Sequence, residues 1–366
     1  MVSGTNGAFA SLRLWDVLRA ARERHASDVH LISGLPPAVR IAGELVALAG
    51  RPISSEEMTE MLRLTLDQEQ RSRLARDADI TVTIEHPECA TMRVHASIVH
   101  GGTSLAIRLL SMTIPNLEEL ALPAIVATLL DRKHGLLIFS GPTGSGKSTS
   151  LAAAIDHLNT IGSRRIICIE DPIEYLHENK RSVITQRQIG RDVASFPSAI
   201  QSALRCDPDV ILIGEMREAS TIRAALQAAE TGHLVLSTLH TGDAPQSVDR
   251  IVDSLADQEQ RSIRATLANV LIGIISQRLV RRRSGKRMRA VFEVLVANDA
   301  VRNLIRDGKS HQIRNAMVMS RDQGMQSFDH HLAELIACGE VEGREAARIS
   351  VALPIERDRS RSGDAR

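Results

Sequence analysis

The stretch that decides the fold is Gly141-Pro142-Thr143-Gly144-Ser145-Gly146-Lys147-Ser148-Thr149. An apolar stretch, residues 136–139, precedes it, and a helix-forming stretch, residues 151–155, follows it. The local order is therefore strand, glycine-rich loop and helix. The sequence satisfies the phosphate-loop pattern G-x-x-x-x-G-K-[ST], in which glycines let successive backbone N–H groups surround a phosphate. The pattern and its flanks predict binding of a nucleoside triphosphate.

Two side chains of this loop carry the expected chemistry. Lys147 is expected to reach the β- and γ-phosphates, and the Ser148 hydroxyl is expected to ligate Mg²⁺. The helix that begins here points its N-terminal N–H groups and the positive end of its dipole at the same place. All nine residues from Gly141 to Thr149 are therefore candidate nucleotide contacts.

The composition is that of an ordinary globular chain with two domains. Its 366 residues exceed one average core, and 43% hydrophobic with 24% charged residues is typical of soluble proteins. The net charge of +1 gives no global attraction to nucleic acid or to an anionic membrane. The cysteines lie far apart without a C-x-x-C pair, which argues against structural zinc and disulfides. Because there is no bilayer-length apolar run and no signal-peptide pattern, we expect a cytoplasmic protein.

The pattern along the chain predicts two domains of different class. Residues 1–112 read as an α+β module, and residues 113–117 read as its exit linker. Residues 118–356 alternate strands and helices, which predicts an α/β domain with a parallel sheet covered on both faces. Residues 357–366 are expected to be a disordered tail. The strands expected in the α/β domain are residues 136–139, 166–169, 210–213 and 234–237.

Acidic residues follow the second of these strands, at the edge where an open α/β sheet places its ligands. They are Glu170, Asp171 and Glu174. Carboxylates at this place can hold Mg²⁺ through water or orient an attacking water. Taken alone, the cluster is equally well interpreted as an acidic surface turn.

The third and fourth strands also end in polar residues. Glu215 ends the third strand in the Walker B arrangement, whereas Asp209 lies at its opposite end and is interpreted as structural. His233 precedes the fourth strand and His240 follows it. A single histidine at such a place more often packs or caps a helix, so the surroundings of His240 decide its role.

These features form an ordered series of motifs. After the phosphate loop come Glu170-Asp171-Pro172-Ile173-Glu174, then Gly214-Glu215-Met216-Arg217, then a histidine-bearing segment at residues 230–241. Residues 300–306 read Ala-Val-Arg-Asn-Leu-Ile-Arg, and residues 324–329 read Gly-Met-Gln-Ser-Phe-Asp. Together they resemble the PilT-type retraction ATPases of type IV pili, in the secretion ATPase superfamily, over almost the whole chain. The resemblance implies a RecA-like P-loop NTPase domain with a smaller N-terminal PAS-like α+β domain.

The resemblance also implies an activity and site roles. It implies a hexameric motor that hydrolyses ATP with Mg²⁺ and powers pilus retraction and twitching motility. Glu174 is then the candidate for orienting the lytic water, with Glu170 and Asp171 in support. Glu215 would act on the metal through its water shell.

Further implied roles lie at the boundary between subunits. His233 and His240 would sense the γ-phosphate or the neighbouring subunit. The family completes its site with arginines of the N-terminal domain, and Arg93 and Arg108 are the matching positions here.

The sequence departs from the family at those arginines. The usual R-x-R-x-N pattern becomes Thr91-Met92-Arg93-Val94-His95. Any contribution of the first arginine must be absent or replaced, and Arg187 and Arg217 are candidate substitutes.

The implied partners are further copies in a homo-hexamer and an inner-membrane pilus platform protein, with a related accessory ATPase as a further candidate. The expected location is cytoplasmic and peripheral at the inner membrane through the pilus machinery. No nucleic-acid partner is expected, because the chain is near neutral and lacks a basic groove with aromatic platforms.

Two alternative functions remain open. A pilus-extension or type II secretion ATPase usually has a longer N-terminal region and paired C-x-x-C motifs, which this chain lacks. An accessory ATP-binding subunit that depends on a partner ATPase is kept open by the altered arginine pattern. The role of residues 300–306 is also open. Val301, Leu304 and Ile305 share one helical face, which fits either an ordinary core helix or a helix that couples the nucleotide state to a partner or a neighbouring subunit.

Overall fold

The computed structural model describes residues 4–41, 44–86, 90–109, 113–285 and 288–349. The chain divides into two compact units, one of residues 1–113 together with Glu174–Leu176 and one of residues 114–173 together with 177–366. The domain limits at residues 112, 118 and 356 stay predictions, and the predicted tail at 357–366 lies outside the described residues. No helix in the described ranges combines the length and the apolar character that a membrane span needs.

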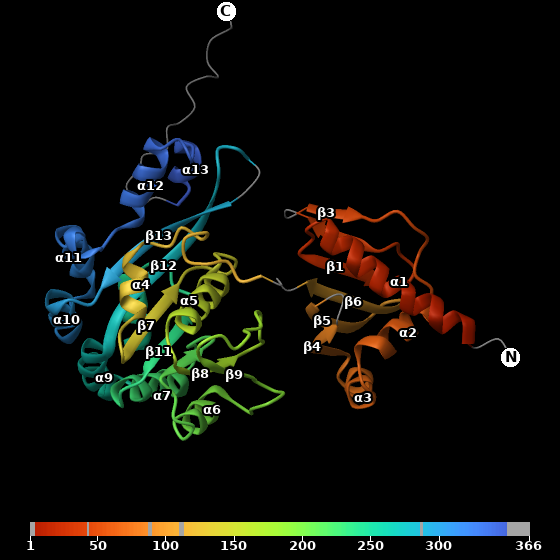
Figure 1. Cartoon of the computed structure of the whole chain (residues 1–366), viewed down its shortest axis with the longest axis horizontal. Helices are drawn as coiled ribbons and strands as arrows, with labels where there is room; N and C mark the ends of the chain where they lie inside the picture. The colour runs from red at the N-terminus through yellow and green to blue at the C-terminus, as the bar shows by residue number, and fades with distance from the viewer. Residues whose placement is uncertain (1–3, 42–43, 87–89, 110–112, 286–287, 350–366) are drawn as a thin grey trace, which may run out of the picture. The chain divides into compact units, whose positions relative to one another are not determined.

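The first unit is an antiparallel sheet with three helices (Figure 1). The strand order is β3-β2-β1-β6-β5-β4. Its elements are α1 (Gly4–Glu23), β1 (Asp28–Ile32), β2 (Ala38–Ile41), β3 (Glu44–Ala47), α2 (Ser55–Thr65), α3 (Gln68–Asp77), β4 (Asp79–His86), β5 (Ala90–Val99) and β6 (Gly102–Leu109). The sequence pattern does not predict β3 or α3, because all four β3 residues are exposed and α3 buries Leu74 alone.

Local signals fix the helices of this unit. A reciprocal capping box between Ser54 and Glu57 starts α2. The chain's single tryptophan, Trp15 on α1, stacks on His86 with 3.8 Å between the ring centroids. The sparse aromatic content leaves aliphatic residues to fill the rest of this core.

The second unit is built on a seven-stranded sheet in the order β13-β12-β7-β11-β10-β8-β9. Its strands are β7 (Gly135–Ser140), β8 (Arg165–Glu170), β9 (Val183–Gln188), β10 (Val210–Ile213), β11 (Leu234–Leu239), β12 (Leu271–Arg281) and β13 (Met288–Val296). Its helices are α4 (Ile125–Leu130), α5 (Lys147–Ile161), α6 (Phe196–Ala203), α7 (Ala219–Glu230), α8 (Ala244–Asp253), α9 (Asp257–Val270), α10 (Asp299–Arg306), α11 (Ile313–Met319), α12 (Phe328–Ala337) and α13 (Gly343–Ala347), with 3₁₀ turns at Ser310–Gln312 and Arg321–Gln323.

The sheet is parallel except at one edge. The four predicted strands are confirmed as β7, β8, β10 and β11, which pair in parallel with one another and with β12 and β9. β13 runs antiparallel to β12, so the parallel sheet that the sequence predicts has one antiparallel strand at this edge. The connection from β12 to β13 has only residues 282–287, too few for the crossover helix that a parallel pair needs.

Helices cover both faces of this sheet, as predicted (Figure 1). Residues Leu136 and Ile138 of β7 face the layer that contains α6 to α11. The alternate residues Leu137 and Phe139 face α4 and α5. Such alternation is the two-residue period of a strand buried on both sides.

Helix α10 has the single apolar face that its sequence predicts. Val301 and Ile305 are buried, and Leu304 packs half-buried against the same core. Arg302 donates to backbone carbonyl oxygens where α9 ends. Asn303 is exposed.

Candidate functional site

The phosphate loop joins β7 to α5, and two of its positions favour glycine. Gly141 has φ 149°, and a Cβ added there would lie 2.3 Å from the carbonyl oxygen of Gln277. Gly146 has φ 89°, and its added Cβ would lie 2.8 Å from Gln277 Nε2. Gly141 therefore excludes a side chain by conformation and by space, and Gly146 disfavours one by conformation. Of the other loop residues, Pro142, Thr143 and Gly144 are exposed and Thr149 is half-buried.

The polar side chains of the loop fit a phosphate. The Lys147 ammonium is buried and donates to the carbonyl oxygens of Gly141 (2.7 Å) and Pro142 (3.0 Å). The Ser145 hydroxyl is buried and has no hydrogen-bond partner among the described residues. A buried polar group without a partner costs about 1–3 kcal/mol, and an anionic oxygen accepting its proton would relieve that cost. Ser148 is exposed on the first turn of α5, where its hydroxyl is open to a ligand.

The ends of β10 and β11 bring Glu215 and His240 together. Glu215 Oε2 lies 3.3 Å from His240 Nε2 and 2.7 Å from Arg217 Nε. The Thr238 hydroxyl donates to the carbonyl oxygen of Gly214 at 2.6 Å, which ties the two strand ends to each other. Arg217 and His240 therefore orient the Glu215 carboxylate from two sides. A change in the charge or position of this carboxylate alters its contact with His240.

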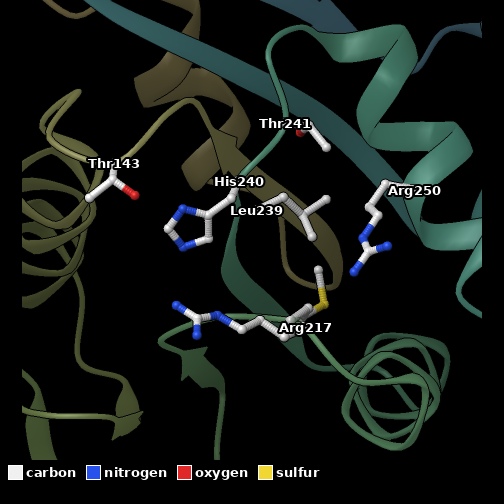
Figure 2. A pocket seen from close by; sticks show the side chains of 7 residues that line it. Thr143, Arg217, Leu239, His240, Thr241 and Arg250 are labelled. Carbon is white, nitrogen blue, oxygen red and sulfur yellow. The ribbon is translucent and has the colours of Figure 1, made fainter.

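A pocket of about 460 Å³ is lined by Arg217 and His240, the two residues that contact this carboxylate. Figure 2 shows Thr143 of the phosphate loop, Arg217 after β10, His240 after β11 and Arg250 of α8 along its walls. Two guanidinium groups and an imidazole give the pocket a lining suited to an anionic ligand. The sequence does not predict Arg250 as a site residue, because a single basic residue on the helix after His240 does not distinguish it from an ordinary surface arginine.

Buried carboxylates hold the start of α8, just after His240. Asp243 caps the helix and forms an ion pair with Arg314 at 2.9 Å. Glu293 of β13 accepts the backbone N–H of Ala244 at 2.8 Å. Burial raises the pKa of Glu293 from 4.5 to about 7, against the Ala244 hydrogen bond and with support from the Asp243 charge.

Comparison with known proteins gives the family. Residues 8–348 match the sequence profile described as "Type II/IV secretion system protein". The chain belongs to this family. It is 38% identical to the type IV pilus retractation ATPase PilT of Pseudomonas aeruginosa, over 93% of this chain and 98% of that protein. It is 40% identical to a twitching motility protein of Neisseria gonorrhoeae, over 91% of this chain and 88% of that protein.

A solved structure agrees with this assignment. The crystal structure of the pilus retraction motor PilT with bound ADP matches with a TM-score of 0.85 and 39% identity, over 92% of this chain and 96% of that one. The predicted fold class is thereby confirmed as a RecA-like ATPase domain with an N-terminal α+β domain. The chain is an ATPase of the type II/IV secretion family and uses a nucleotide.

In this secretion ATPase the predicted acids lie at the end of β8 and in the loop that follows it. Glu170 ends the strand and accepts a hydrogen bond from Gln186 Nε2 at 3.1 Å. Asp171 is exposed, and Glu174 lies farther along the loop toward β9. A Cβ added to Gly214 would lie 3.3 Å from Glu170 Cα, so the ends of β8 and β10 adjoin. The catalytic roles of the three acids stay predictions.

The structure does not bring His233 to the pocket. His233 precedes β11, at the end of the strand opposite His240. Its Nδ1 lies 3.0 Å from the Ala228 carbonyl oxygen and 3.2 Å from the Thr231 hydroxyl. Its role at a subunit boundary stays a prediction, whereas Asp209 has the structural role expected, because its carboxylate accepts the backbone N–H of the first β8 residue at 2.7 Å.

The predicted arginines of the N-terminal domain form a cross-strand pair. Arg93 of β5 is the register partner of Arg108 of β6, and Arg108 forms a 2.9 Å ion pair with Asp28. His95, which stands where the family has asparagine, has Nδ1 2.9 Å from Thr81 Oγ1. Action of Arg93 and Arg108 in a neighbouring subunit stays a prediction.

The two candidate substitutes for the missing arginine differ. Arg217 lines the pocket. Arg187 of β9 instead donates to the Ser202 hydroxyl of α6 at 3.1 Å. Within this secretion ATPase unit, Arg217 and Arg250 are therefore the arginines placed to meet an anion in the pocket.

Proposed function

We propose that this chain is the ATP-hydrolysing motor that powers type IV pilus retraction and twitching motility. The observation that carries the proposal is the pocket that joins the phosphate loop to His240, whose imidazole contacts Glu215. The chain is similar to a pilus retraction ATPase along nearly its whole length, which favours retraction over the extension and type II secretion alternatives.

The phosphate loop binds the nucleotide. Backbone N–H groups and the Ser145 hydroxyl donate to phosphate oxygens, and Lys147 neutralises charge at the β- and γ-phosphates. The exposed Ser148 hydroxyl and the Glu215 carboxylate suit Mg²⁺, which prefers oxygen ligands and keeps several waters. When bound, Mg²⁺ supplies charge neutralisation to the transferring phosphoryl group.

The acidic residues at the strand ends position the attacking water and respond to loss of the γ-phosphate. Glu174 orients the attacking water, with Glu170 and Asp171 in support. Because Glu215 contacts His240, loss of the γ-phosphate changes the charge around both side chains together.

Assembly completes the site. The chain works as a homo-hexamer with ATP between neighbours, where Arg93, Arg108 and His233 act at the subunit boundary. Motion of one domain against the other through residues 113–117 passes work to an inner-membrane platform protein. The motor is cytoplasmic and held peripherally at the inner membrane by the pilus machinery, and a related accessory ATPase is a further partner candidate.

Two measurements test this function. The purified chain should hydrolyse ATP without any partner, and absence of turnover would instead support an accessory subunit. Deletion of the gene should abolish twitching while surface pili remain. Loss of surface pili would indicate extension, and normal twitching would contradict retraction.

The acids have a test of their own. Glu174→Gln and Glu215→Gln should each bind nucleotide with near-normal affinity and lose hydrolysis, because each keeps size and removes a charge that positions water or metal. Binding is measured by fluorescence titration and hydrolysis by phosphate release. If affinity falls as much as turnover, the two carboxylates serve ground-state binding instead.

A further inference from the structure

Strand β12 carries three polar residues in succession within a buried segment. Residues 271–277 are all buried, and Ser276, Gln277 and Arg278 interrupt an otherwise apolar run. Burial of polar groups is unfavourable unless they are hydrogen-bonded, so these side chains need specific partners. Their partners lie in or next to the phosphate loop and the loop that carries His240, and Arg278 also contacts the C-terminal helical region.

Gln277 lies directly beneath the phosphate loop. It is 3% exposed, and its Oε1 accepts a hydrogen bond from the Ser150 hydroxyl of α5 at 2.7 Å. Its Nε2 and its backbone carbonyl occupy the space where Gly146 and Gly141 would carry a Cβ. Gln277 therefore contacts both glycines of the loop and the first turns of the helix that follows it.

Ser276 fixes the strand that leads into the same loop. Its hydroxyl lies 2.7 Å from the hydroxyl of Ser140, the last residue of β7 and its register partner. Both hydroxyls are fully buried. This hydrogen bond fixes the position of β12 along β7 immediately before Gly141.

Arg278 points to the opposite face of the sheet. Its guanidinium donates to the carbonyl oxygen of Gly242 at 3.0 Å, two residues after His240. It also donates to the carbonyl oxygen of Ile349 at 2.6 Å and lies 4.6 Å from the ring centroid of Phe328. Arg278 therefore holds the loop that carries His240 and ties it to α12 and to the chain after α13.

We propose that Gln277 and Arg278 are positioning residues that fix the phosphate loop and the His240 loop relative to each other. Consecutive residues of a strand project to opposite faces, so one peptide segment carries both supports. Any shift of β12 moves the two loops together, and the pocket between Thr143 and His240 keeps its geometry. The inference rests on the proposed motor function and adds the residues that set its site.

The proposal predicts different kinetics for the two positions. Gln277→Leu, and Ser150→Ala from the other side of the same hydrogen bond, should lower kcat at least about tenfold and raise the KM for ATP, because a misplaced phosphate loop both binds and reacts poorly. Arg278→Met should lower kcat by about tenfold with KM within about threefold of wild type, because Arg278 supports the His240 loop and not the phosphate loop.

A matched control separates positioning from loss of a buried hydrogen bond. Asn159 is a fully buried amide at the far end of α5. It donates to the Glu178 carbonyl oxygen at 2.7 Å and accepts the backbone N–H groups of Lys180 (3.1 Å) and Ser182 (3.3 Å). Asn159→Leu should lower the melting temperature at least as much as Gln277→Leu does, yet keep the wild-type KM and the wild-type affinity for nucleotide. The double variant Ser150→Ala/Gln277→Leu should lose no more activity than Gln277→Leu alone, because both changes break one interaction.

Affinity for a fluorescent ADP analogue gives a readout that needs no turnover. It should fall about tenfold in Gln277→Leu and stay near wild type in Arg278→Met and Asn159→Leu. Wild-type affinity and kinetics in both Gln277→Leu and Ser150→Ala, or an equal loss in Asn159→Leu, would overturn the proposal. If Gln277→Leu does not fold, Ser150→Ala decides. A wild-type chain without turnover would refute the motor function, whereas the affinity pattern would still decide the positioning role.

Discussion

Replacing Glu293 with glutamine should make the stability of the second unit less sensitive to pH. Glu293 is 3% exposed, and burial raises the pKa of its carboxyl from 4.5 to about 7. A carboxyl whose pKa is higher in the folded protein stabilises the fold fully below pH 4.5, and this contribution is lost as the pH rises through about 7. Glutamine keeps a carbonyl oxygen for the Ala244 N–H and has no titrating proton.

The magnitude follows from the two pKa values. The free energy of unfolding changes by about 1.4 kcal/mol per pH unit inside the window from 4.5 to about 7, so the whole window is worth about 3 kcal/mol. Roughly 2.5 kcal/mol of this is lost between about pH 5 and about pH 8. For a unit of this size, that loss lowers Tm by on the order of 5 °C.

Urea unfolding followed by circular dichroism at several pH values tests this reasoning. Wild type should lose roughly 2.5 kcal/mol more than Glu293→Gln between about pH 5 and about pH 8. Glu178→Gln changes an exposed carboxyl of the same unit and should follow wild type. Parallel pH profiles for wild type and Glu293→Gln would refute the raised pKa.

Three further predictions concern the motor. Lys147→Ala should abolish ATP turnover, measured by phosphate release, while circular dichroism shows a folded protein; unchanged turnover would remove Lys147 from the site. Arg93→Ala should slow hydrolysis only in the assembled ring, and mixing it with Lys147→Ala subunits should restore some activity, because some interfaces then hold both intact halves. No rescue in proven mixed rings would place Arg93 outside the shared site. Asn303→Ala should keep assembly and most ATPase activity yet abolish twitching, and normal twitching by this variant would refute coupling through α10.

The central strands of the second unit are predictable because burial on both faces demands continuous apolar runs. β7, β10 and β11 are buried at every position, and their sequences show it. β9 reads Val-Ile-Thr-Gln-Arg-Gln and is only half-buried, so its pattern is too polar to distinguish from a loop. β12 contains the polar residues 276–278, whose partners are distant in sequence, and neither β12 nor β13 is predicted.

The residues of the candidate site also fall into those that the sequence predicts and those that it does not. Glu215 and His240 are predictable because neighbouring parallel strands end at one edge of the sheet, and the structure places them 3.3 Å apart. Arg250 reaches the pocket from a helix packed on the sheet, and Gln277 reaches the phosphate loop from a neighbouring strand. Both placements depend on tertiary packing, which a local pattern does not encode.

Trp15 makes the two units optically distinguishable. It is the chain's single tryptophan, and it lies in the first unit, stacked on His86. Its fluorescence emission therefore follows unfolding of the first unit, whereas circular dichroism follows both. In one denaturant titration the two transitions coincide if the units unfold together and separate if they unfold in turn. The chain thus carries a built-in reporter of which half of the molecule loses its structure first.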